Sequence, residues 1–407
     1  MNLYLAFVLV VLAGSFVLDL VVEWLNLRRL DPQLPEEFIG FYDQEKYARS
    51  QNYVRECTRF GLFRNSLATT ATLAFILLGG FNLVDQMARS LVRGSMVTGL
   101  IFMLALTLIS SFFSLPFSIY STFVIEEKYG FNRTSVKTFI LDLLKGFLLM
   151  IVIGGPLLAL VIWFFGSAGK AAWVIVWSTI TVFQLFMTYL APVVIMPIFN
   201  QFTPLAEGEL KSMIEAYARA QGFKMKGVFT MDGSKRSSKT NAFFTGFGRY
   251  RRIVLFDTLI EKHSTEELLT ILAHEMGHYK LKHVAIIMIV SVLETGLLLF
   301  LLSFFLQNPG LFAAFRMEHV SIYASLVFFG FLYSPLGIFL SIAMNHISRR
   351  QELAADHYAV QTTGKVGAFI AALKRLSVEN LSNLTPHPLK VFLEYSHPPV
   401  LQRIKSL

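Results

Sequence analysis

The stretch SMVTGLIFMLALTLISSFFSLPFSIYSTF, Ser95–Phe123, contains no acidic or basic residue. A helix needs about 20 mainly apolar residues to cross the hydrocarbon core of a bilayer, so this run is long enough to span one. Hydrophobic residues make up 54% of the 407 residues and charged residues only 15%. An ordinary soluble domain has about 25% charged residues. The composition therefore predicts a multi-pass membrane protein.

Six further apolar runs are also long enough to cross a membrane. The seven predicted spans are Leu3–Val22, Leu67–Val84, Ser95–Phe123, Phe147–Phe165, Ala171–Met196, Val284–Leu306 and Ile322–Met344. The first run is not predicted to be a cleaved signal peptide, because it lacks a basic start and Arg28 and Arg29 follow it. The predicted fold class is an all-α polytopic membrane protein with seven transmembrane helices.

The positions of the basic residues predict the orientation in the membrane. The segments after the first and third runs hold nine Lys and Arg residues, whereas those after the second, fourth and sixth hold four. Because cytoplasmic loops carry the excess of Lys and Arg, the N-terminus is predicted outside and both residues 200–283 and the C-terminus inside. The net charge of +9 comes from such loops, so we expect no nucleic-acid partner. The single cysteine, Cys57, excludes an internal disulfide and a Cys-rich metal site.

The segment 200–283 is the one large polar insertion between apolar runs. It predicts a helix over Glu207–Gln221, an extended stretch at Gly227–Met231 and a second extended stretch ending at Phe256, which together indicate a small β-sheet. Ser264–Glu267 fits a capping box, and the helix that it starts is predicted to run on toward the sixth span. The predicted organisation is a membrane part (1–199), a catalytic segment (200–283), two more spans (284–346) and a C-terminal cytoplasmic segment (347–407).

The helix after this capping box contains HEMGH, residues 274–278. Positions i and i+4 of a helix lie on one face, so His274 and His278 can hold one metal ion. Zinc lowers the pKa of a bound water to about 7. Glu275 can then accept the proton of that water and pass it to the leaving amine. Gly277 costs about 1 kcal/mol relative to Ala in mid-helix, and it therefore predicts a close approach of another segment.

A catalytic zinc needs a third protein ligand and an open fourth position. His283 is predicted to lie on a different face of the helix from His278. The better candidates are Glu352 and Asp356, again i and i+4, in the helix expected to continue from the seventh span. We predict Glu352 as the third ligand of one Zn²⁺ per chain and Asp356 as an acceptor for a ligand histidine N–H. The alternative is a solvated helix face that balances Arg349 and Arg350.

The segments HEMGH, SRRQELAAD and EYSHPPVLQRI resemble the CaaX prenyl protease type 1 family of integral-membrane zinc endopeptidases. The segments LPEEF, EKYARSQNY and SKRSSKTNAFFTGFGRYRRIVLFDTLI also resemble it. The resemblance implies a ring of seven helices enclosing an intramembrane chamber, with a mainly helical zinc domain on the cytoplasmic side. It implies removal of the residues after a prenylated cysteine. It also implies His274, His278 and Glu352 as zinc ligands and Glu275 as general base. We predict Arg349, with Asp356, around these ligands.

Two further motifs take on roles through this resemblance. NAFFTGFG, from Asn241, suits an edge strand and turn, and the resemblance implies that Asn241, Ala242 and Phe243 contact an extended substrate. The pattern alone also fits a plain sheet strand. In SHPPVLQRI, the resemblance implies that His397 and Arg403 are active-site residues, where an imidazole and a cation could stabilise an oxyanion. Without it, His397 would be read as a loop histidine.

Two other functions compete with the prenyl protease. One is a quality-control protease for membrane proteins with no prenyl requirement. The other is a non-proteolytic seven-span transporter or scaffold, which the intact HExxH motif and the distant Glu352 disfavour. We expect a peptide or protein substrate within a lipid bilayer and no obligate protein partner. Because the chain ends without a retrieval signal for the endoplasmic reticulum, a bacterial plasma (inner) membrane is favoured.

Overall fold

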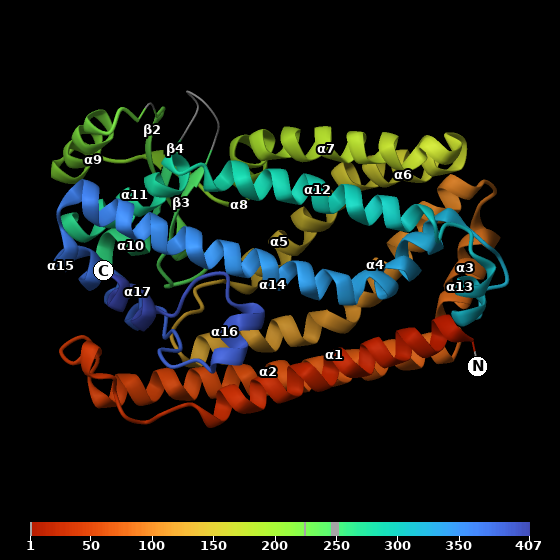
Figure 1. Ribbon diagram of the computed structural model, residues 1–407, viewed down its shortest axis with the longest axis horizontal. Coiled ribbons are helices and arrows are strands. Elements are labelled where there is room, and N and C mark those ends of the chain that lie inside the picture. The colour runs from red at the N-terminus through yellow and green to blue at the C-terminus, as the bar shows by residue number, and fades with distance from the viewer. Residues whose placement is uncertain (1, 224, 246–251) are drawn as a thin grey trace.

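The structure is a computed structural model that describes residues 2–223, 225–245 and 252–407. Figure 1 shows long helices lying side by side along the longest axis of the molecule. The β-strands and several short helices gather at one end, together with the C-terminus. The N-terminus lies at the other end, beside α3 (Gly80–Leu91) and α13 (Pro309–Ala314). A membrane protein whose long helices run across the bilayer is expected to have two different ends, one on each side of the membrane.

Seven helical segments among the described residues are long and apolar enough to cross a membrane, as the sequence predicts. Short 3₁₀ turns (η1, η4) and π-helical turns (η2, η3, η5) adjoin or continue the helices. In chain order the elements of this part are α1 (Leu3–Arg28), η1 (Glu36–Phe38), α2 (Gln44–Leu77), α3, α4 (Ser95–Tyr120), η2 (Ser121–Glu126), α5 (Val136–Leu149), η3 (Met150–Gly154), α6 (Gly155–Ser167), η4 (Gly169–Ala171), α7 (Ala172–Leu190), η5 (Ala191–Ile195) and α8 (Met196–Phe199). The last two spans are α12 (His283–Ser303) and α14 (Ile322–Thr363).

The second span differs from the predicted Leu67–Val84. The helix α2 begins at Gln44 and ends at Leu77, and the chain then turns into α3. Gly79 makes this turn with a φ of 77°, a left-handed conformation that glycine adopts readily. The apolar run therefore passes through a turn, and the span is shifted toward the polar residues before it. The fourth span is also longer than the predicted Phe147–Phe165, because its helix begins at Val136.

The seven spans surround an open interior. Only 6–17% of the residues in the most apolar window of each span are buried. Helices in a tight bundle would bury their inward faces. Between α2 and α4 lies a cavity of about 400 Å³ with a partly polar lining that includes Arg64, Ser114 and Ser121. These features agree with the predicted intramembrane chamber.

The end of the molecule that holds the C-terminus carries a four-stranded sheet and short helices. The strands have the order β1-β2-β4-β3, with β2 and β4 parallel and the other two pairs antiparallel. The sheet thus leaves β3 at an edge. The elements here are β1 (Phe202–Pro204), α9 (Glu209–Ala220), β2 (Gly227–Met231), η6 (Gly233–Lys235), β3 (Ala242–Thr245), β4 (Arg252–Phe256), α10 (Asp257–Lys262), α11 (Thr265–Lys280), α15 (Val366–Glu379), α16 (Pro388–Glu394) and α17 (Val400–Ser406).

These elements match the predicted small sheet within a mainly helical domain. The strand β2 has the predicted bounds, β4 ends at Phe256, and α9 falls inside the predicted Glu207–Gln221. Residues 246–248 of the NAFFTGFG motif lie outside the described residues.

The domain is joined to the membrane part by α14. This helix continues from the last span into the domain, as the sequence predicts, and packs along α11. Leu272, Met276 and Phe369 belong to a buried apolar cluster that joins α11, α15 and the sheet. Burying such side chains contributes about 1.5–3 kcal/mol each. The same packing that stabilises the domain therefore sets the distance between α11 and α14.

Candidate metal centre

The helix α11 begins at the predicted capping box. The Ser264 hydroxyl accepts a hydrogen bond from the Glu267 N–H (3.3 Å), and the Glu267 carboxylate accepts one from the Ser264 N–H (3.0 Å). Arg375 of α15 pairs with the same carboxylate at 3.2 Å. The cap satisfies backbone donors that the first helical turn leaves free. It fixes where the helix starts, and with it the face on which His274 and His278 lie.

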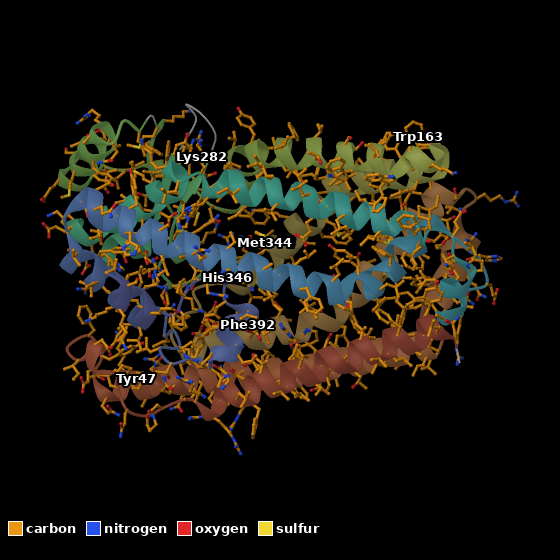
Figure 2. The ribbon with its side chains drawn as sticks, viewed as in Figure 1. Tyr47, Trp163, Lys282, Met344, His346 and Phe392 are labelled. Atoms are coloured by element: carbon orange, nitrogen blue, oxygen red, sulfur yellow. The ribbon has the colours of Figure 1, made fainter. Side chains whose placement is uncertain are left out.

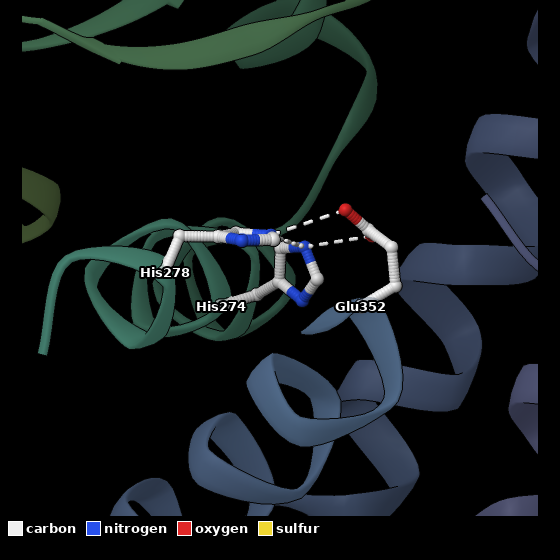
Figure 3. A group of neighbouring side chains, drawn as sticks. All are labelled: His274, His278 and Glu352. Atoms are coloured by element: carbon white, nitrogen blue, oxygen red, sulfur yellow. Dashed lines mark hydrogen bonds and ion pairs between the residues drawn. The ribbon is translucent and has the colours of Figure 1, made fainter. Parts of the chain in front are cut away.

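His274, His278 and Glu352 converge in space, as Figure 3 shows. The Nε2 atoms of the two histidines are 3.1 Å apart, and they lie 3.4 and 3.2 Å from the two carboxylate oxygens of Glu352. Ligand atoms on a tetrahedral zinc at about 2.0–2.1 Å are expected about 3.3 Å from one another. The buried Oε2 of Glu352 has no hydrogen-bond partner among the described residues. The three residues therefore fit a metal ion.

Two charged residues stand behind His274. Its Nδ1 lies 2.8 Å from Oδ1 of Asp356, which is fully buried. Arg403 donates to both oxygens of Asp356, from Nε at 2.8 Å and from Nη2 at 2.5 Å. Burial disfavours charge on the His274 imidazole, but Asp356 and Glu352 outweigh burial and raise its pKa to about 9. The pocket thus favours positive charge at this position, which a metal cation would also supply.

Glu275 and His397 lie next to the three candidate ligands. Glu275 is half-buried, and this desolvation raises the pKa of its carboxyl group against the opposing charges of His274 and His278. His397 places Nε2 3.3 Å from Oε1 of Glu352, and 63% of its side chain is exposed. An imidazole that is accessible and close to a ligand carboxylate can reach a peptide bound at the metal.

Arg349, which is predicted around the metal ligands, makes its hydrogen bonds to main-chain carbonyls. Its Nη1 donates to the carbonyls of Val391 (3.0 Å) and Tyr395 (2.6 Å) at the end of α16. Main-chain carbonyls at a helix C-terminus carry partial negative charge and attract a guanidinium. Arg349 therefore secures the segment that leads to His397 rather than a site carboxylate.

His283 is a site residue that the sequence analysis missed. Its Nδ1 lies 3.1 Å from Nδ1 of His278, and its side chain is buried. The expectation that it lies on another face assumed one continuous helix. Instead α11 ends at Lys280, and Lys282 adopts a φ of 60° before α12 begins. No Gly or Pro signals this break, so periodicity alone could not find it.

The strand β3 contains two of the three predicted substrate contacts, and Asn241 directly precedes it. Ala242 packs toward the apolar cluster of the domain, whereas the Phe243 ring lies against Phe256. Asn241 is exposed, and its Oδ1 accepts a hydrogen bond from the Ala242 N–H at 2.9 Å. Among the described residues no strand pairs with the outer edge of β3. That edge can accept an extended peptide through main-chain hydrogen bonds.

Gly277 lies where α11 and α14 come closest, as the sequence predicts. A Cβ there would be 3.3 Å from both the Cα and the carbonyl oxygen of Ala355, which is three residues after Glu352. We expect Gly277→Val to push α14 away and lower metal affinity by about tenfold or more, as loss of ligand support does. Metal titration of the purified protein measures this. Gly367→Val, at an open position of α15, should leave affinity unchanged, and equal values for both variants would contradict the expectation.

Comparisons with known proteins agree with this site. Residues 23–201 match the family model of the CAAX prenyl protease N-terminal region with five membrane helices, and residues 204–407 match Peptidase family M48. The chain is 34% identical to a CAAX prenyl protease 1 homolog of Oryza sativa subsp. japonica, over 99% of this chain and 97% of that protein.

Two further matches cover nearly the whole chain. The CAAX prenyl protease 1 of Saccharomyces cerevisiae is 35% identical, over 94% of this chain and 89% of that protein. The crystal structure of S. mikatae Ste24p has a TM-score of 0.95 and 33% identity, and the match covers 100% of this chain and 99% of that chain. The chain therefore belongs to peptidase family M48, as an integral-membrane metalloendopeptidase with the CAAX prenyl protease N-terminal region.

Proposed function

We propose that this protein uses one zinc ion to cleave peptide bonds in CaaX substrates, removing the residues after a prenylated cysteine. The observation that carries the proposal is the convergence of His274, His278 and Glu352, with Asp356 and Arg403 behind them. Nitrogen and carboxylate donors in a set of three suit zinc and leave a fourth position open. The names of the matched relatives support the substrate class.

The side chains divide the chemistry among them. A zinc ion held by the three ligands would supply positive charge that acidifies water and polarises the scissile carbonyl. Glu275 accepts the proton of the attacking water and delivers it to the leaving amine, because its raised pKa suits both steps. His397, whose Nε2 lies 3.3 Å from Oε1 of Glu352, would donate to the oxyanion that forms on the carbonyl. Asp356 holds the orientation of His274, and Arg403 holds Asp356.

The substrate is proposed to lie along β3 as an added strand. Asn241, Ala242 and Phe243 would then present main-chain donors and acceptors, while the side chains of the peptide reach pockets on either side. The position of β3 is set by the segment before it. The three successive carbonyls of Ser238–Thr240 accept hydrogen bonds from Lys262 (2.9 Å), Thr258 (2.9 Å) and Asn380 (3.3 Å). This clamp keeps the edge strand beside α11.

Asn380 is the member of the clamp nearest to β3, because its amide also accepts from the Thr240 N–H at 3.1 Å. We expect Asn380→Ala to raise KM about tenfold, since two hydrogen bonds that order the strand are worth roughly 1–2 kcal/mol together. The kcat value and bound zinc should change little. Steady-state kinetics on a farnesylated peptide measure KM and kcat separately. The control is Asn383→Ala, because the Asn383 amide donates to Asn26 of α1 and not to the clamp. An equal rise in KM for the two variants would contradict the role of the clamp.

The substrate class is tested with purified protein and two matched peptides, one with a farnesyl group on its CaaX cysteine and one without. We expect preferential cleavage after the farnesylated cysteine. Equal rates on both peptides would favour a quality-control protease. Bound zinc without hydrolysis of either peptide would favour a transporter or scaffold.

The orientation is proposed from the excess of Lys and Arg in the odd-numbered connections. Figure 1 places the N-terminus and C-terminus at opposite ends, as seven spans require. We expect reporter fusions after Lys170 and at Leu407 to give opposite signals, with Leu407 cytoplasmic. Identical signals would show that the chain crosses the membrane a different number of times. A bacterial plasma membrane and the four-part division at residues 199, 283 and 346 remain proposals from the sequence.

A further inference from the structure

A cleft of about 1120 Å³ lies between the first half of α2 and the segment after α4. Its upper wall, nearest the start of α2, is charged: it carries the basic residues Lys46, Arg49, Arg55, Arg59 and Lys128 and the acidic residues Asp43, Glu45 and Glu56. Its lower wall is aromatic, with Phe60 and Phe63 of α2 and Tyr120 of α4. The Phe60 and Tyr120 rings stack with their centroids 5.0 Å apart. A polar wall thus meets an apolar wall within one cleft.

The arginines of this cleft lack acidic partners. Lys128 pairs with Glu56 at 2.7 Å, whereas no carboxylate among the described residues lies within ion-pair distance of Arg49, Arg55 or Arg59. Arg55 donates to the neutral Asn52 side chain at 2.7 Å. Arg55 and Arg59 are i and i+4 on one helix, a spacing at which like charges repel. Asp43, Glu45 and Glu56 also line the cleft, but none of them pairs with these three arginines, and a guanidinium group can bind two phosphate oxygens at once.

Both helices of the cleft change from polar to apolar at its lower wall. In α2, residues 44–59 contain six charged side chains, whereas residues 60–77 contain one, Arg64. In α4 and η2, no charged residue occurs from Ser95 until Glu126. A membrane boundary is expected where such sequences change, and aromatic side chains are enriched there. Phe63 is 58% exposed and Tyr120 is 46% exposed, as expected of side chains at that boundary.

The cleft lies on the opposite face of α2 from a second cavity. On the other side of α2, Cys57 and Gly61 line a cavity with Asp19 of α1 and Glu394 of α16. Successive residues of an α-helix are rotated by about 100°, so residues two apart lie on roughly opposite faces. Arg59 and Phe63 are each two residues from Gly61, a member of that second cavity. The cleft therefore lies on the opposite face of α2 from it.

We propose that this cleft is a binding site for a phospholipid with an anionic headgroup. The headgroup phosphate lies between Arg49, Arg55 and Arg59, and an acyl chain runs down over Phe63 and Tyr120 into the bilayer. Basic pockets between transmembrane helices at the membrane surface bind such headgroups through charge and phosphate hydrogen bonds. The apolar lower wall favours a lipid over a soluble phosphate ion as the occupant. A phosphate ion alone would leave the Phe63 and Tyr120 rings uncovered.

The test is native mass spectrometry of the delipidated full-length protein, titrated with phosphatidylglycerol or with phosphatidylcholine of the same acyl chains. We expect phosphatidylglycerol to bind and phosphatidylcholine to bind far more weakly. The variant Arg49→Gln/Arg55→Gln/Arg59→Gln should weaken phosphatidylglycerol binding about 100-fold, taking roughly fivefold for each basic residue. The charge-matched variant Arg133→Gln/Lys137→Gln/Lys235→Gln removes three exposed basic residues outside the cleft. It should bind phosphatidylglycerol as the wild type does.

Two further measurements separate a lipid from a free anion. Phe63→Ser should weaken phosphatidylglycerol binding, and excess inorganic phosphate should not displace the lipid. Efficient displacement by phosphate, or binding unaffected by Phe63→Ser, would make this a soluble-anion site and overturn the proposal. Equal binding by the two triple variants, or equal binding of the two lipids, would also overturn it. If the triple variant does not fold, the single change Arg59→Gln should still weaken binding about fivefold.

Discussion

Glu275→Gln should abolish nearly all peptide hydrolysis while leaving bound zinc unchanged. The three candidate ligands remain, so the metal site keeps its donors. The neutral amide, however, cannot accept the proton of the attacking water. Loss of a positioned general base typically costs about 100- to 10,000-fold in rate. The measurements are kcat on a farnesylated CaaX peptide and zinc content of the purified protein.

The matched variants for this prediction change a ligand instead of the base. His274→Ala and Glu352→Ala should lose both zinc and activity, since each removes one donor of the set. Glu275→Gln with near-normal turnover would show that another group moves the proton. Glu275→Gln without zinc would show that the carboxylate supports the metal site itself.

Arg403→Ala should lower kcat by about 10- to 100-fold, although the residue lies close to the C-terminus. Chain ends are often frayed and dispensable. Here the guanidinium binds both oxygens of the buried Asp356, whose Oδ1 lies against His274. Removing one partner of a buried charge pair leaves the other uncompensated. Lys405→Ala is the control, because 71% of the Lys405 side chain is exposed and its partner is Glu37 of η1.

A double-mutant cycle separates two possible roles of Arg403, support of Asp356 and direct stabilisation of the oxyanion. If Arg403 acts by holding Asp356, then the combined variant should lose no more activity than Asp356→Ala alone. If its guanidinium stabilises the oxyanion directly, the two losses should multiply. Zinc affinity, measured alongside kcat, should fall with Asp356→Ala in the first case. Wild-type rates for Arg403→Ala would assign the residue to a dispensable tail.

The sequence by itself determined the parts of this protein that depend on local geometry. Apolar runs determined seven spans, because no shorter helix crosses a bilayer. The i, i+4 spacing of His274 and His278 placed both on one helix face, and the Ser264 capping box placed the start of that helix. Gly277 predicted the close approach of a second helix. These features follow from positions a few residues apart, and the structure has all of them.

Only the tertiary structure decided features that depend on where distant segments meet. The left-handed residues Gly79 and Lys282 end helices that hydropathy and periodicity would continue, and the second break brings His283 onto His278. Arg349 and Arg403 are both predicted as site residues, yet Arg349 binds the end of α16 and Arg403 binds Asp356. A long cationic side chain can reach many acceptors. Which acceptor it reaches is set by the packing of helices that lie far apart in the chain.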